Sequence, residues 1–175
     1  TKPKSQRGGD SATDETSSEV YRVDAQGKVT IRSKDETATG EAAVYDFDKK
    51  VLVMEGDPVI LTTTDGTVTA HRAIQYWSDE NVAVAEGDAL AVESAAKDGR
   101  RIKADKLTAF FRETPDAAPV AKSTGKKDVS KTPSKQGRDL VFLQGAGNVV
   151  LTTQNEIVRG DRANYNLDTG MATVD

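Results

Sequence analysis

Few residues in this 175-residue sequence could take part in catalysis or metal binding, because it contains one histidine and no cysteine. The histidine, His71, stands where similar stretches of the sequence have Glu41, Asp105 and Asp161, so we expect a polar residue that faces solvent. One histidine gives no convincing Ser-His-Asp set, and the absence of cysteine removes the thiolate ligands of most zinc sites. The sequence therefore predicts a protein that is not an enzyme, with no cofactor and no metal site.

Two further motifs resemble functional sites and have simpler explanations. The Gly-Asp pairs at 56–57 and 87–88 could belong to paired carboxylates for hydrolysis or to a calcium-binding turn. Turn chemistry alone accounts for both residue types, and we favour it. Arg159-Gly160-Asp161 spells a cell-adhesion tripeptide, but the same place in another stretch holds Thr39-Gly40-Glu41. We therefore interpret the tripeptide as a position in a repeat.

The composition indicates strands and turns as the elements that carry these residues. Val, Thr, Ala, Gly and Asp are frequent, whereas Leu, Phe and Trp are sparse. The net charge of −4 gives no reason to expect a nucleic-acid partner. No apolar run approaches the roughly 20 residues that a membrane helix needs. The length suits one domain, which we place at residues 20–175.

Two stretches of low complexity differ from the rest of the chain. Residues 1–19 have no apolar side chain larger than Ala12 and mix both charge signs, so we expect this segment to be disordered. Residues 113–138 are rich in Lys, Pro, Ser and Ala, and we expect a flexible surface excursion within the domain. The excursion is either a solvated loop or a basic arm that contacts phosphate groups.

The remaining sequence is repetitive. One half of the repeat begins with glycine at a predicted turn and continues into a strand, in the stretches 27–31, 56–61, 87–92 and 147–151. The other half runs from a small residue to an aromatic one, in the stretches 40–45, 70–76, 104–110 and 160–165. The two middle copies are one residue longer, which a β-bulge or a different alignment would explain. Stacked copies share one core, and the pattern predicts a folded-over β-sandwich or an open jelly roll.

The repeated pattern, Gly-[Asp/Asn]-x-Val followed by [Gly/Ala]-[Asp/Glu/His]-x-Ala-x-Tyr-[Asp/Asn], resembles the OstA-like family of lipopolysaccharide-transport proteins, and most closely its soluble periplasmic bridge component. The likeness covers about residues 20–112 and 139–175, and it is greatest in 101–107 and 147–163. The resemblance implies an antiparallel β-jelly roll that is open at both ends and holds lipid A acyl chains between its sheets. It also implies a periplasmic location after removal of a signal peptide, and head-to-tail self-association. The implied partners are lipopolysaccharide and the sister OstA-like domains of the inner-membrane and outer-membrane transport components.

A lipid-binding interior needs a continuous apolar surface, because each methylene group removed from water contributes about 0.8 kcal/mol. The many Ala and Val residues and the few large ones favour an interior that its own side chains leave underfilled. The alternative is an ordinary dry core, and in apolar runs such as 51–54 the sequence does not determine which face points inward. The predicted lining residues are Val29, Ile31, Val51, Val53, Val59, Leu61, Val82, Val84, Leu90, Val92, Ile102, Phe110, Val149, Leu151 and Ile157.

The sequence stops at Asp175, where the pattern would continue with another Gly-Asn-Val strand, so we expect open sheet edges. Such edges can pair with an identical copy or with a sister domain. The predicted edge residues are Val20, Val23, Val29, Tyr165, Ala172 and Val174. Two alternatives to a periplasmic bridge are an OstA-like domain of a membrane-anchored transport partner and a carbohydrate-active or structural β-repeat protein.

Overall fold

The computed structural model describes residues 20–94, 99–113 and 138–175. These residues form one antiparallel sheet of 11 strands and no helix, which confirms the predicted all-β class. No helix that could span a membrane occurs in these ranges. The strands are β1 (Arg22–Arg32), β2 (Glu36–Asp46), β3 (Val51–Glu55), β4 (Val59–Thr63), β5 (Gly66–Ala70), β6 (Ala73–Trp77), β7 (Val82–Glu93), β8 (Arg101–Glu113), β9 (Arg138–Thr152), β10 (Ile157–Asn166) and β11 (Met171–Val174).

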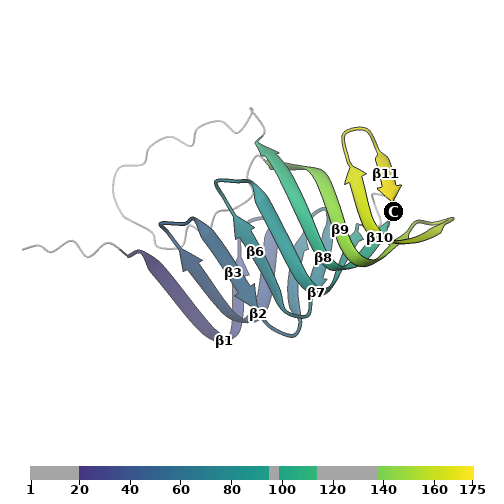
Figure 1. Ribbon diagram of the computed structural model, residues 1–175. Coiled ribbons are helices and arrows are strands. Elements are labelled where there is room, and N and C mark those ends of the chain that lie inside the picture. The colour runs from purple at the N-terminus through teal and green to yellow at the C-terminus, as the bar shows by residue number, and fades with distance from the viewer. Residues whose placement is uncertain (1–19, 95–98, 114–137) are drawn as a thin grey trace, which may run out of the picture.

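The sheet is folded over because its long strands belong to two layers. One part of β2, residues 42–46, pairs with β3, and the other part, residues 36–39, pairs with β4. In the same way β7 pairs with β6 through residues 82–86 and with β5 through residues 90–93. We call the layer with β3, β6 and β11 the front layer and the layer with β4 and β5 the rear layer (Figure 1). The long strands cross from one to the other, as in the predicted folded-over jelly roll.

Each long strand bends where it passes between the layers, and glycine makes three of the bends. Gly27, Gly87 and Gly147 have φ angles of 77°, 89° and 78°, and the residue after each also has a positive φ. The pairing register shifts at all three positions. The prediction of turns there is therefore wrong, because the strand continues through the glycine as a bulge. At Gly56 the chain does leave the strand, and a short connection joins β3 to β4.

The small residues of the other half-repeat lie at the same bends. A Cβ atom on Gly40 would come within 2.9 Å of the Glu55 carbonyl oxygen, so only glycine fits beside that backbone without a shift. Ala70 and Ala104 occupy the corresponding places in β5 and β8 and are fully buried. The extra residue of the second copy falls in the break between β5 and β6 at His71 and Arg72. The repeat is thus the sequence signature of a bend.

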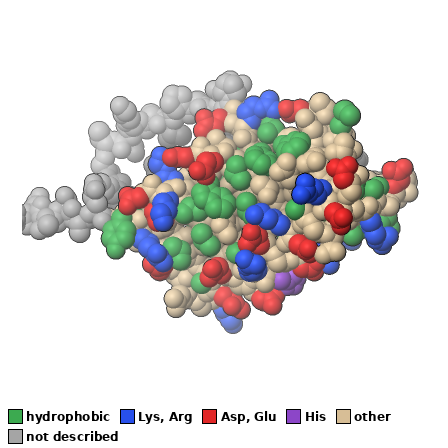
Figure 2. All heavy atoms as spheres, viewed as in Figure 1, with side chains coloured by type: hydrophobic (Ala, Val, Ile, Leu, Met, Phe, Trp, Pro, Cys, Tyr) green, Lys and Arg blue, Asp and Glu red, His purple; other side chains and the backbone are tan. Residues whose placement is uncertain are grey.

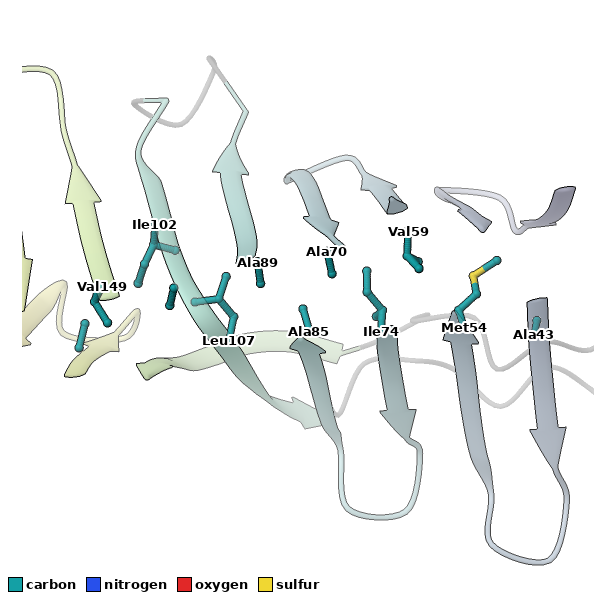
Figure 3. Close-up of a cluster of buried hydrophobic side chains, with 12 residues drawn as sticks. Ala43, Met54, Val59, Ala70, Ile74, Ala85, Ala89, Ile102, Leu107 and Val149 are labelled. Atoms are coloured by element: carbon teal, nitrogen blue, oxygen red, sulfur yellow. The ribbon is translucent and has the colours of Figure 1, made fainter. Parts of the chain in front are cut away.

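The hydrophobic core lies inside these bends. Side chains of the rear layer, such as Val59 and Ala89, point toward side chains of the front layer, such as Met54 and Ile74 (Figure 3). Ala is the commonest residue of this core, so the two layers approach closely at the bend. The largest fully buried side chains are only valines, Val59 and Val149. The core is therefore a narrow strip along the bend.

Candidate ligand-binding interior

The inner faces of the two layers form one apolar surface along the length of the sheet. Residues that are paired across neighbouring strands lie on the same face, so the register assigns each side chain to the inside or the outside. In the rear layer, Ile31, Ala38, Leu61, Val68 and Ala91 follow one another on the inner face. The same surface contains the predicted lining residues Val29, Ile31, Val59, Leu61, Ile102, Val149 and Leu151, all of which belong to the core or pack against it.

The structure places the other predicted lining residues on the outer face. In the rear layer, Ile157 pairs with Thr152, and Leu90 and Val92 pair with Lys103 and Arg101. In the front layer, Trp77 lies between Val51 and Val82 on the outside. Apolar side chains also gather on this outer face (Figure 2). The outer residues among the predicted lining are Val51, Val53, Val82, Val84, Leu90, Val92, Phe110 and Ile157.

For Phe110 the outward direction has a physical cause in the bend. In β8 the inner residues are Ile102 and Ala104 before the bend and Leu107 and Ala109 after it. The bulge thus reverses which alternate residues face inward, and Phe110 points outward. Strands that are apolar on both faces give no pattern of alternation that could correct the assignment.

The sequence interpretation also missed a row of inner residues in the front layer. Tyr45, Leu52, Tyr76, Leu143 and Tyr165 lie on this row, connected through the small residues Ala83 and Ala109. Three of these residues are the aromatic ends of the half-repeats. The repeated aromatic residue was therefore a signal for the inner face.

Burial falls with distance from the bend. Val59, Ala70 and Ala89 at the bend are 0% exposed. Leu61, Val68 and Ala91, two residues further along their strands on the same face, are only half-buried although they pack against the core. The front layer shows the same change between Met54 and its inner neighbour Leu52. The side of the interior away from the bend therefore presents apolar surface that the protein does not fully cover.

One polar group lies on this open side. Arg100, just before β8 in the rear layer, is held by Glu93 at the end of β7, with Nε 2.8 Å from Oε2. Arg100 also donates a hydrogen bond to the hydroxyl oxygen of Tyr165 in the front layer. The carboxylate of Glu93 raises the pKa of Arg100, since it accepts hydrogen bonds from the charged guanidinium. The guanidinium is thus permanently charged where it meets the other layer.

The predicted edge residues divide between true edges and an inner strand. Among the described residues, β1 pairs with β2 alone and β11 with β10 alone, so Val23, Val29, Ala172 and Val174 lie on edge strands. Val20 precedes β1. Tyr165 is not at an edge, because it pairs with Leu143 on one side and Ala172 on the other. The sequence interpretation did not include Ile157 and Val158 among the edge residues. Both lie in the rear part of β10, which pairs only with β9 within the described residues.

His71 lies at the bend with an exposed side chain, as expected from its position in the repeat. Its Nδ1 is 2.6 Å from Oδ1 of Asp57, and both side chains face solvent. No group of three or more metal-binding side chains occurs in the described ranges. The predicted disordered segment 1–19 and most of the predicted excursion at 113–138 lie outside the described residues.

The fold has a counterpart among solved structures. No protein-family model matches the sequence, and no curated protein matches it. The chain is similar in structure to LptH from Pseudomonas aeruginosa, described as the LptA-homologous periplasmic component of the conserved lipopolysaccharide transport device. The match has a TM-score of 0.55 and 14% sequence identity, and it covers 79% of this chain and 80% of that chain. The protein therefore has an LptA-like antiparallel β-jelly-roll fold.

Proposed function

We propose that this protein binds lipopolysaccharide through its lipid A acyl chains and carries it across the periplasm without catalysing a reaction. The observation that supports this proposal most directly is the inner apolar surface that stays half-exposed on the side away from the bend. The structural likeness to a periplasmic lipopolysaccharide-transport component agrees with it.

The energetics of an acyl chain suit this surface. Removing a chain of a dozen methylene groups from water gains on the order of 10 kcal/mol at most. That gain needs apolar neighbours along the whole chain, and the inner faces supply them on both sides through Leu61, Val68 and Ala91 in the rear layer and Leu52 and Leu143 in the front layer. A charged headgroup would remain at the open side, in contact with water.

Photo-crosslinking from neighbouring positions of one strand tests this function. A photoreactive amino acid at Leu151, on the inner face of β9, should crosslink to purified lipopolysaccharide when illuminated. The matched control is Val150, which is half-buried like Leu151 but points to the outer face, where Lys103 and Arg159 are its paired neighbours. Crosslinks at both positions alike, or at neither, would contradict binding between the layers.

Competition with deacylated lipopolysaccharide separates lipid binding from carbohydrate binding. If the acyl chains carry the affinity, the deacylated molecule should not reduce the crosslink at Leu151 even in large excess. Competition by the deacylated molecule would instead favour the alternative of a carbohydrate-binding protein.

The bridge that we propose also requires association between domains. The edge strands β1 and β11, together with the rear part of β10, present backbone groups that could pair with a second copy or with a sister domain of a membrane-bound partner. Head-to-tail pairing would continue both layers and their inner surface from one copy into the next.

A further inference from the structure

Arg100 spans the open side of the interior. It lies just before β8 in the rear layer, where its carbonyl oxygen accepts a hydrogen bond from the Glu93 amide at 2.8 Å. Its side chain reaches Tyr165 of the front layer, and its guanidinium carbon lies 5.0 Å from the centre of the tyrosine ring. The contact therefore joins two layers that are otherwise packed together at the bend.

The position of the contact relative to the bend follows from the register. Tyr165 lies two residues beyond the buried core residue Ala163, and both face inward. Glu93 lies two residues beyond Ala91 on the inner face of β7. The polar contact thus lies further from the bend than Ala91 and closes the open side above the half-buried apolar surface.

This ion pair is better shielded than others on the molecule. The side chains of Arg100 and Glu93 are 32% and 21% exposed, whereas those of Arg112 and Asp168 are 59% and 57% exposed. Shielding reduces screening by water, and a charged donor strengthens the hydrogen bond to the tyrosine hydroxyl. Glu93 also fixes the direction of the guanidinium, because it accepts hydrogen bonds from both Nε and Nη2.

We propose that Arg100, Glu93 and Tyr165 form a clasp that holds the two layers together at this end of the interior and limits the entry of apolar chains from the open side. The inference rests on the proposed function for the nature of the ligand. Entry from the side requires Arg100 and Tyr165 to separate. Glu93 keeps Arg100 in place while they are apart, so the clasp can close again behind the chain.

Thiol labelling measures access to the interior without any ligand. These 175 residues include no cysteine, so Ala91→Cys introduces a single thiol beneath the clasp. Its rate of reaction with N-ethylmaleimide is compared between the parent and a Tyr165→Phe background, which keeps the ring and removes the hydroxyl acceptor. Loss of a hydrogen bond to a charged group should raise the rate roughly tenfold.

Two controls distinguish a clasp from a general loosening of the fold. Arg112→Gln removes an arginine–carboxylate pair within the front layer and should leave the rate at Ala91→Cys unchanged. A thiol at Ala38→Cys, on the same inner face but in β2, should react at the same rate with and without the Tyr165 hydroxyl. Equal rates at Ala91→Cys in the parent and in both Tyr165→Phe and Arg100→Gln would overturn the clasp.

Lipopolysaccharide binding then separates the clasp from the proposed function. If the clasp and the lipid function are both correct, Tyr165→Phe speeds the appearance of the Leu151 photo-crosslink after mixing. Faster thiol labelling without any crosslink in the parent would support the clasp and contradict the lipid function. A crosslink in the parent together with unchanged labelling rates would support the lipid function and contradict the clasp.

Discussion

At the residue scale, glycine at a bend meets two separate demands. Gly27, Gly87 and Gly147 all adopt a left-handed conformation that other L-residues enter only with strain. The neighbouring strand adds a second demand at Gly87, where a Cβ atom would lie 2.8 Å from the Arg72 Cβ atom. Gly27 has no atom within 4 Å of that place, because β1 is the outermost strand among the described residues. The same residue type is therefore constrained differently at the edge and inside the sheet.

Substitution of these glycines should show the difference. Gly27→Ala adds only conformational strain and should lower the free energy of unfolding by about 1 kcal/mol. Gly87→Ala adds the clash with Arg72 and should lower it by about 3 kcal/mol. Urea denaturation of both variants measures the two values. Equal losses of unfolding free energy would mean that the neighbouring strand shifts to accommodate the Cβ atom without further loss of stability.

The ion pair between Arg22 and Asp24 gives a second residue-scale prediction. The hydrogen bonds that Asp24 accepts from Arg22 lower the pKa of its carboxyl group below the ordinary value. A carboxyl group with a lowered pKa contributes its stabilisation at neutral pH and loses it as the pH falls through that pKa. Arg22→Gln should therefore raise the pKa of Asp24, as followed by an NMR titration of its carboxyl carbon. An unchanged titration would show that the pair is absent in solution.

At the element scale, the strands and the positions of the bends could be predicted from the sequence, but the direction of each side chain could not. The repeated Gly and small residues located the bends correctly, although the glycines were interpreted as turns. Phe110 and Leu107 show why direction failed: both are apolar, and only the bulge between Lys103 and Lys106 determines that Leu107 faces inward. The outer apolar residues, such as Val84, removed the alternation on which such assignments depend.

Two isoleucines of the predicted lining provide a test of the assigned faces. Ile102 is 6% exposed and belongs to the core, whereas Ile157 is 60% exposed. Ile102→Ala should lower the free energy of unfolding by about 3 kcal/mol, because it leaves a cavity at the inner face. Ile157→Ala should change it by about 0.5 kcal/mol or less. Denaturation curves of both variants provide the comparison, and similar losses would contradict the assigned faces.

At the scale of the whole molecule, the folded-over sheet could be predicted from the sequence, whereas the pairing of its outer strands could be predicted only in part. Counting repeats indicated that the last copy stops near Asp175. It did not indicate that β11 covers β10 only in the front layer, where residues 163–166 pair with residues 171–174. Within the described residues the rear part of β10 therefore pairs only with β9, a division between the layers that a linear pattern does not display.

Self-association is the prediction at this scale. Val23→Lys places a charge on the edge strand β1, where the side chain is exposed, and should weaken association roughly tenfold by hindering edge pairing. Thr64→Lys adds the same charge in the turn between β4 and β5 and should have no effect. Sedimentation velocity over a range of concentrations measures the association. A parent protein that stays monomeric at high concentration would contradict the proposed bridge.

The continuous aliphatic row beside the bend has a consequence for motion. On successive strands of the rear layer the half-buried inner position is occupied by Ile31, Ala38, Leu61, Val68 and Ala91, all of which are aliphatic. An acyl chain that slid past one strand, a step of about 4.8 Å, would exchange one set of aliphatic neighbours for another. The free-energy profile along such a track would be nearly flat, so the interior would allow one-dimensional diffusion without favouring a direction. Net transport would then be driven by supply at one end and removal at the other.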